Sequence, residues 1–240
     1  DMRADEATRR ELCERLSNGS FGDFPRRRRA RMTVGVKKLD ITLAMFQKPF
    51  DLPSAKNVVL QVSRALLFLH KAGFVHGRLG ADMILVEPDG QVRVKLPDDD
   101  SCTVQDLSRR PLEVLLGLER TPAVDLWAVG LLLFELVTNG TKLFDVAARD
   151  EDHLAQVVDL LGDIPSHLVD AGLAKNFVPE PRERTVVPSP KLAKRLHRQH
   201  GFTDVAAARI AMFVKVFLVH SPSARITAEE AASLPWLQCG

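Results

Sequence analysis

The apolar residues of segment 121–137, TPAVDLWAVGLLLFELV, surround the predicted helix on every side instead of forming one stripe along it. A helix with this pattern belongs inside a folded domain. Pro122 suits its first turn, and Gly140 suits its end. Asp125 and Glu135 within the apolar run argue against a span through a membrane. We therefore predict that this segment is the buried central helix of a helix-rich domain.

Apolar residues at helical spacing predict further helices, at residues 6–17, 39–46, 54–72, 151–161, 205–219 and 227–233. Ser54 is placed to cap one of them, and Thr227, followed by Ala-Glu-Glu, has the signature of a capping box. Runs of β-type residues predict short strands at 32–36, 83–86 and 91–96, the last two joined by an Asp89-Gly90 turn. Residues 172–190 are punctuated by prolines and are expected to be irregular. The pattern predicts a mainly helical fold with a few short strands in its first half.

Composition narrows the class of protein only slightly. The chain has 240 residues, of which 45% are hydrophobic, enough for one good core or two small ones. Its net charge of +2 predicts neither a nucleic-acid partner nor a membrane surface. The three cysteines, Cys13, Cys102 and Cys239, are an odd number and widely separated, which favours free thiols over disulfides or a zinc site. Free thiols, with no visible signal or membrane segment, favour an intracellular location.

Several motifs follow the helix 54–72 in a specific order. They are FVHGRLGADMILVEPDGQVRVKL, RPLEVLLG, TPAVDLWAVG and SPSARITAEEAASLPWL. From about residue 39 to residue 237, this order resembles the carboxy-terminal lobe of a eukaryotic protein kinase. RPLEVLLG and the stretch from residue 149 look most like the SR-protein kinase branch, while the His76-Gly77 pair is similar to parasite rhoptry pseudokinases.

The resemblance implies a fold class that is mainly α: a kinase-like C-terminal lobe with a truncated or incomplete N-terminal lobe, α+β overall. Residues 1–38 would be the remnant of the N-terminal lobe, with a regulatory helix at 6–17 and its last strand at 32–39. Residues 39–240 would form the C-terminal lobe. In the alternative assignment, residues 17–24 are a glycine-rich nucleotide loop and Lys37 is the strand lysine, but a lone G-x-F-G is a weak signal.

The family's catalytic-loop pattern, H-R-D-L-K-P-E-N, falls on residues 76–83. Arg78 then stands at the position of the catalytic base, and a guanidinium stays protonated in proteins. Gly80 stands at the lysine position and has no charge to place on a phosphate. Met83 stands at the metal-binding asparagine position, and its thioether offers no hard oxygen to magnesium. The resemblance therefore implies a degenerate catalytic loop.

The family's second metal ligand, the aspartate of D-F-G, is less clear. Counting without a gap puts Leu96 in that position, and Val92 and Val94 then alternate as the family's strand does. A slip of two residues would put Asp98 there instead. Residues 98–100 are three aspartates, which either form a solvated loop or hold a cation without catalysis. We favour Leu96 in the ligand position and expect no metal and no cofactor.

The resemblance also implies architectural roles for charged residues. Asp125 would reach the backbone of the His76 loop, which accounts for a carboxylate in an apolar helix. Glu113 would pair with Arg225. His76 would pack below the loop and would bind no metal.

These substitutions predict a pseudokinase that acts as a protein-binding, scaffolding or regulatory module. Acidic residues are expected to dock a basic or Arg/Ser-rich peptide, because they stand where SR-protein kinases hold such peptides; they are Asp150, Glu151, Asp152 and Asp159. A helix would show Asp152 and Asp159 on one face, although a solvated acidic face has the same pattern. Two rival hypotheses stay open: an atypical Ser/Thr kinase that uses Asp82 or Asp98, and a structural subunit of a larger complex. The pattern leaves the oligomeric state open.

Overall fold

The structure is a computed structural model, and it describes residues 42–46, 48–87, 91–96, 107–145, 149–171 and 191–238. Several features predicted from the sequence lie outside these ranges. They are the helix 6–17, the strand 32–36, Lys37, the Asp89-Gly90 turn, Asp98 and its two neighbours, the irregular stretch 172–190 and the three cysteines.

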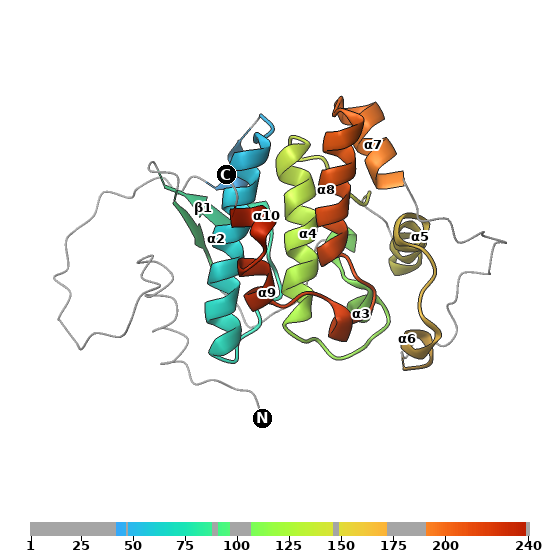
Figure 1. The fold of residues 1–240 in the computed structure, drawn as a ribbon. Coiled ribbons are helices and arrows are strands. Elements are labelled where there is room, and N and C mark those ends of the chain that lie inside the picture. The colour runs from blue at the N-terminus through green and yellow to red at the C-terminus, as the bar shows by residue number, and fades with distance from the viewer. Residues whose placement is uncertain are drawn as a thin grey trace, which may run out of the picture.

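The described residues form a helical domain with one small sheet (Figure 1). The α-helices are α2 (Leu52–Lys71), α3 (Leu112–Leu115), α4 (Ala123–Val137), α5 (Asp150–Leu161), α6 (Ser166–Ala171), α7 (Lys191–His200), α8 (Asp204–Phe217), α9 (Ala228–Ala232) and α10 (Pro235–Gln238). The 3-10 helices are η1 (Leu43–Met45), η2 (Ala81–Met83), η3 (Leu107–Arg109) and η4 (Pro222–Ala224). The strands are β1 (Ile84–Val86) and β2 (Val92–Val94). This composition confirms the predicted mainly helical class.

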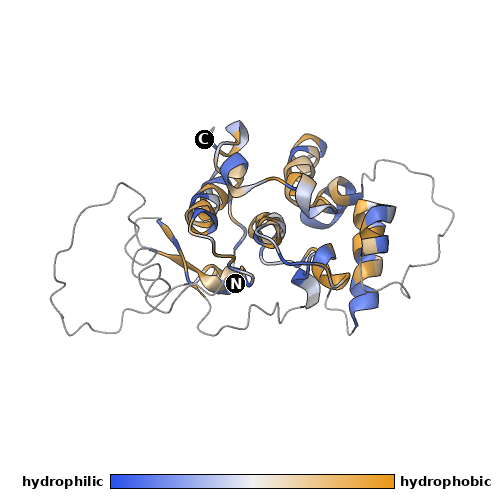
Figure 2. Ribbon diagram, turned by 90° about the horizontal axis from the view of Figure 1, so that it is seen from below, coloured by the Kyte–Doolittle hydropathy of each residue, from blue (hydrophilic) through white to orange (hydrophobic). Residues whose placement is uncertain are grey.

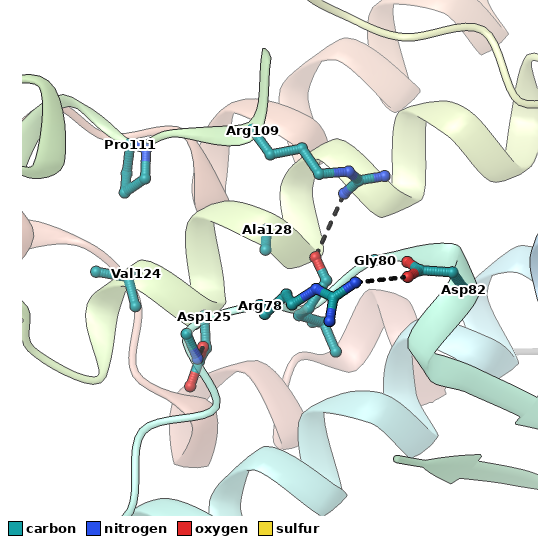
Figure 3. Close-up of a pocket in the computed structure, with 10 residues that line it drawn as sticks. Arg78, Gly80, Asp82, Arg109, Pro111, Val124, Asp125 and Ala128 are labelled. Atoms are coloured by element: carbon teal, nitrogen blue, oxygen red, sulfur yellow. Dashed lines mark hydrogen bonds and ion pairs between the residues drawn. The ribbon is translucent and has the colours of Figure 1, made fainter. Parts of the chain in front are cut away.

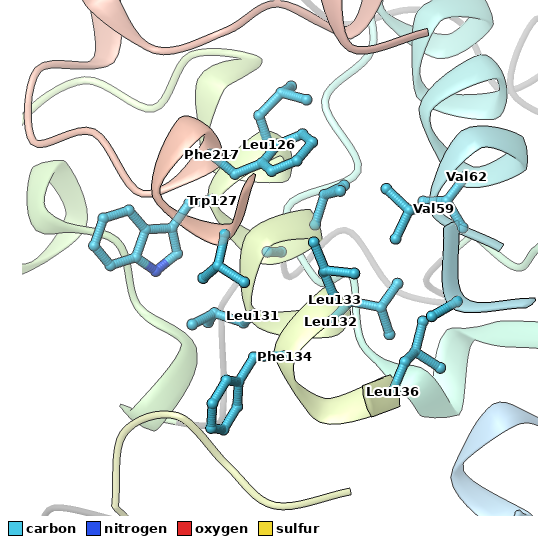
Figure 4. Close-up of a cluster of buried hydrophobic side chains, with 14 of the residues drawn as sticks. Val59, Val62, Leu126, Trp127, Leu131, Leu132, Leu133, Phe134, Leu136 and Phe217 are labelled. Carbon is cyan, nitrogen blue, oxygen red and sulfur yellow. The ribbon is translucent and has the colours of Figure 1, made fainter. Parts of the chain in front are cut away.

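Helix α4 lies at the centre of the core, as its all-round apolar pattern predicts. Every residue from Val124 to Val137 is buried. Side chains leave α4 on all sides, with Trp127 and Phe134 pointing away from the valines that α2 contributes (Figure 4). Helices α2 and α8 flank α4 (Figure 1), and the apolar sides of the helices face one another (Figure 2).

Gly130 sets the close approach between α4 and α8. A Cβ atom at this position would lie 2.8 Å from the Cβ of Phe217 and 3.0 Å from a methyl group of Leu218. A larger side chain would therefore push the two helices apart, because a packed interior leaves little room for added atoms.

The predicted cap of α2 is wrong by three residues. The helix begins at Leu52, and its cap is Asp51, whose Oδ1 accepts a hydrogen bond from the Ser54 backbone N–H at 2.8 Å. Pro53 fits inside the first turn, where its missing N–H costs nothing. The capping box at Thr227 is confirmed, since Thr227 and Glu230 exchange side-chain to backbone hydrogen bonds.

The two strands form an antiparallel pair in which Ile84 lies opposite Val94. The sheet packs on α2, and the Val92 N–H donates to Gln61 Oε1 of that helix at 2.8 Å. The polypeptide thus leaves α2, passes through the loop at His76 and enters β1, so the sheet and α2 together hold both ends of that loop.

The hydrophobic pattern does not predict four of the helices, α3, α6, α7 and α10. Three of them have six residues or fewer, too few for a periodic signal. Helix α7, KLAKRLHRQH, buries only Leu192 and Leu196 and presents basic and polar residues elsewhere. Its position depends on packing against α8, which the local sequence does not encode.

No single helix in the described ranges has the length and apolarity needed to span a membrane. By length and composition alone, one pair passes the same test, Asp204–Phe217 with Pro222–Gln238, which is bent by 119°.

Two partly buried histidines give the fold a predicted sensitivity to acid. Burial lowers the pKa of His220 below its ordinary value of 6.5; the Gly162 carbonyl opposes this, Arg225 adds to it and Asp163 opposes it. Burial, followed by the charge of Arg195, also lowers the pKa of His200. The neutral ring is favoured in the folded state, so the unfolded chain takes up protons first as pH falls through about 6.5.

We therefore expect the melting temperature to be flat above about pH 7 and to fall by several degrees between about pH 6.5 and 5. Thermal unfolding at a series of pH values across this range measures the change in melting temperature. His220→Gln should flatten the slope, whereas His167→Gln, at an exposed position, should not. A melting temperature that rises on acidification would contradict the prediction.

Candidate functional site

Asp125, in the first turn of α4, fixes the loop that follows α2. Its side chain is 1% exposed and accepts two backbone hydrogen bonds, from the His76 N–H at 2.9 Å and the Gly77 N–H at 2.8 Å. Its Oδ2 also lies 2.9 Å from His70 Nε2 of α2. One carboxylate thus joins α4, α2 and the loop.

His76 is buried and links the loop to the end of β2. Its Nδ1 accepts the Arg78 backbone N–H at 3.2 Å, so the ring proton is assigned to Nε2, which donates to the Lys95 carbonyl at 2.7 Å. Gly77 next to it has φ 72°, a left-handed conformation that glycine adopts without strain. Both ring nitrogens of His76 are therefore occupied by contacts within the chain.

A cavity of about 260 Å³ opens between this loop and the start of α4 (Figure 3). Its charged lining residues are Arg78, Asp82, Arg109 and Asp125. The rest of the lining consists of Gly77, Leu79, Gly80, Pro111, Val124 and Ala128. The cavity therefore has charged groups from the loop, η2, η3 and α4, and an apolar side formed by α4 and Pro111.

Arg78 and Asp82 lie at the exposed side of the cavity. Arg78 reaches towards Asp82, and the two charged groups are 3.8 Å apart (Figure 3). Their side chains are 36% and 60% exposed, so water screens the pair. A guanidinium accepts no proton, and Arg78 has no base chemistry to offer at this place.

Arg109, at the end of η3, is fixed on the opposite side of the cavity. Its guanidinium pairs with the carboxylate of Glu135 in α4, and it donates to the Leu79 carbonyl at 3.5 Å. A Cβ atom on Gly80 would lie 2.6 Å from Asp82 Oδ1 and 3.7 Å from the Arg109 Cζ. The backbone at Gly80 is therefore close to both the Asp82 carboxylate and the Arg109 guanidinium.

The side chains of Met83 and Leu96 are largely withdrawn from solvent. Met83 is only 7% exposed, and Leu96 is partly buried against the main core. Within the ranges that the structure describes, no three His, Cys, Asp or Glu side chains gather closely enough to hold a metal ion.

Glu113 in α3 and Arg225 after η4 form a fully buried pair, with both side chains 0% exposed. Two nearly parallel hydrogen bonds join them, at 2.7 and 2.9 Å. Arg225 also donates to the Ala123 carbonyl at 2.7 Å and to the Val219 carbonyl, and its guanidinium lies 5.1 Å from the Trp127 ring centroid. The structure thus brings together these two residues, which are far apart in the sequence.

The acidic residues of α5 are not part of the cavity, and each pairs with a basic residue of the same chain. Arg110 contacts Asp150 at 2.8 and 3.0 Å, Arg149 contacts Asp152 at 3.1 and 3.2 Å, and Lys191 contacts Asp159. Glu151 lies 3.9 Å from Arg149. Each of these carboxylates therefore already has a cation of the same chain beside it.

Sequence reasoning missed Arg109 and Glu135 as residues of the site. The position of Glu135 in the sequence does indicate a role, since a carboxylate inside an apolar helix needs a partner in order to be buried. The position of Arg109 indicates none, because arginines at loop positions are ordinary and only the fold brings it to α4.

The model of the protein kinase domain matches residues 35–237 of the chain. Over 181 residues, the chain is 30% identical to SRSF protein kinase 3 of Mus musculus; the match covers 66% of this chain and 32% of that protein. It is 28% identical over 169 residues to serine/threonine-protein kinase SKY1 of Saccharomyces cerevisiae, covering 63% of this chain and 23% of that one.

A broader match has similar identity. Over 207 residues, the chain is 28% identical to mitogen-activated protein kinase HOG1 of Wallemia sebi, with 82% of this chain and 71% of that protein covered. The chain spans about a third of the length of SRSF protein kinase 3. Three findings agree: the family model matches residues 35–237, Asp125 holds the loop of a helical domain, and the chain is similar to SRSF protein kinase 3. The chain therefore belongs to the protein kinase domain family, near the SR-protein kinase branch.

Proposed function

We propose that this domain is a pseudokinase that binds a protein partner and transfers no phosphate. The observation that carries the proposal is Arg78 at the family's base position, beside the cavity where an acceptor hydroxyl would need a proton acceptor. A permanently protonated group there neither takes a proton nor orients a hydroxyl as a carboxylate would.

Two further positions support the proposal. Gly80 offers no cation to a transferring phosphate, and the buried Met83 thioether offers no oxygen to Mg²⁺. Phosphoryl transfer depends on positioning and charge stabilisation by such groups, so three changes in one loop would remove most of what the site contributes.

The second candidate is an atypical kinase with displaced catalytic groups. Asp82 favours it, because this carboxylate lines the cavity and is 60% exposed. Against it, the Asp82 carboxylate already lies 3.8 Å from the Arg78 guanidinium. Asp98, the other residue named for this role, lies outside the described residues.

For the partner, we propose a basic or Arg/Ser-rich peptide on the acidic residues of α5. Asp152 and Asp159 are about half exposed, and their present partners are exposed side chains of this chain. Exposed ion pairs contribute little, typically about 0–1 kcal/mol. Arginines of a peptide, which bind carboxylates in bidentate geometry, would be able to replace them. Membership of a larger assembly as a structural subunit is compatible with this surface.

A phosphotransfer assay with the full-length protein tests the proposal. We expect no phosphate incorporation into an Arg/Ser-rich peptide above background with ATP and Mg²⁺, because the loop lacks a proton acceptor and an Asn-type metal ligand. Thermal unfolding with ATP, with and without Mg²⁺, should show no Mg²⁺-dependent rise in the melting temperature.

Two variants make the assay decisive. Incorporation that Asp82→Asn abolishes would overturn the proposal and identify a displaced base. Incorporation that neither Asp82→Asn nor Arg78→Ala changes would point to a contaminating kinase.

Peptide binding tests the docking surface. The double substitution Asp152→Asn and Asp159→Asn should weaken binding of an Arg/Ser-rich peptide about tenfold or more. Equal binding by the variant and the unchanged protein would refute the α5 surface.

A further inference from the structure

We propose that the cavity beside Arg78 binds the phosphate of a phosphorylated serine or threonine side chain on a protein partner. The inference rests on the proposed non-catalytic function, because it makes the cavity a binding site instead of a reaction centre. Pockets for drug-sized ligands have about 300–1,000 Å³. At about 260 Å³, this cavity suits a single modified side chain.

The charges that line the cavity favour an anion. Of the Arg109–Glu135 pair, only the arginine belongs to the lining, and the carboxylate lies behind it in α4. Asp125 does belong to the lining, but its two oxygens already accept the His76 and Gly77 N–H groups and face His70. In the part of the chain that the structure describes, two guanidinium groups therefore line the cavity together with one loosely held carboxylate, that of Asp82.

Asp82 is the group that an entering anion would displace. Its contact with Arg78 is 3.8 Å long and exposed, so it holds Arg78 only weakly. A phosphate monoester carries about −1.5 to −2 charge at neutral pH and binds a guanidinium through two parallel hydrogen bonds. Phosphate should therefore displace Asp82 from Arg78, while the Arg109 guanidinium, held in place by Glu135, also lines the cavity.

The remaining lining suits the stem of such a side chain. Pro111, Val124 and Ala128 form an apolar side opposite the loop (Figure 3). At Gly80 the Asp82 carboxylate lies so close to the backbone that a Cβ atom there would be 2.6 Å from its Oδ1. The apolar side and the guanidinium groups together match an aliphatic stem that ends in a phosphate.

Fluorescence anisotropy with the full-length protein tests the proposal. The probes are one labelled peptide of otherwise neutral composition in three forms, with serine, phosphoserine or glutamate at its centre. We expect the phosphoserine form to bind at least about tenfold more tightly than the serine form, with glutamate between them. Inorganic phosphate and Mg²⁺-free ATP serve as competitors, and only weak competition is expected from either.

Two substitutions should act in opposite directions. Arg78→Gln should weaken phosphopeptide binding about tenfold, and Asp82→Asn should tighten it severalfold by removing the competing carboxylate. Arg64→Gln, at an exposed position of α2, is the matched control and should change nothing. Both cavity residues are at least one-third exposed, so neither variant should unfold the domain.

Equal binding of the serine and phosphoserine forms would overturn the proposal, as would weaker binding by Asp82→Asn. Strong competition by ATP alone would assign the cavity to a nucleotide and would also overturn it. These outcomes are distinct from failure of the pseudokinase proposal, which phosphate incorporation would reveal.

Discussion

Arg225→Met is expected to lower the free energy of unfolding by about 3–5 kcal/mol. The substitution leaves the Glu113 carboxylate, which is 0% exposed, as a buried charge without its bidentate partner. The Ala123 and Val219 carbonyls also lose the guanidinium donors that now reach them. Urea denaturation monitored by the fluorescence of the buried Trp127 measures the loss.

A second variant separates the buried charge from lost packing. Combining Arg225→Met with Glu113→Leu removes both charges, and a pair of apolar residues can replace a buried ion pair at little cost. Recovery should be partial, since the two carbonyls remain without the arginine. If the double variant were no more stable than Arg225→Met alone, the buried charge would not be the cause.

The exposed pair Lys71–Glu229 provides the matched control. Its charged groups are 3.3 Å apart, but the side chains are 64% and 69% exposed. Lys71→Met should change the stability by less than about 0.5 kcal/mol, because water screens the pair. If Lys71→Met and Arg225→Met lowered the free energy of unfolding by similar amounts, burial would not be what makes the Glu113–Arg225 pair important for stability.

The sequence alone predicts the parts of the fold that local patterns encode. The all-round apolar segment becomes the central helix α4, and the Thr227 capping box forms as expected. The predicted cap of α2 is wrong, because Ser54 and Asp51 are both good caps and only the backbone geometry selects Asp51. Helix α7 carries only a short local signal, the leucines Leu192 and Leu196 four residues apart, and this signal is easily missed in a segment otherwise basic and polar.

The candidate site is predictable to a different extent. Family motifs place Asp125, Glu113 and Arg225 at positions that the structure joins by hydrogen bonds. Arg109 is not predictable in this way, because its contact with Glu135 joins residues that no short motif relates. The internal cations on α5 are also invisible in the sequence, since Lys191 reaches Asp159 only through the packing of α7.

Asp125→Ala is expected to have the second large effect, a loss of about 3 kcal/mol of stability together with local opening of the loop. The His76 and Gly77 N–H groups are buried, and each donor left unsatisfied costs about 1–3 kcal/mol. His70 loses its contact with the same carboxylate. Urea denaturation measures the global loss, and amide hydrogen exchange at residues 76 and 77 measures the opening.

Asp125→Asn is the graded control, because an amide keeps one acceptor oxygen but turns an NH₂ group towards N–H donors. Its loss should be of similar sign and smaller, and exchange at the Gly77 amide should rise less than in Asp125→Ala. Asp82→Asn, on the exposed side of the same cavity, should leave both amides protected. Since the loop carries Arg78, opening it should also abolish any binding in the cavity. Unchanged exchange at both amides in Asp125→Ala would mean that the Asp125 carboxylate does not hold the loop in place.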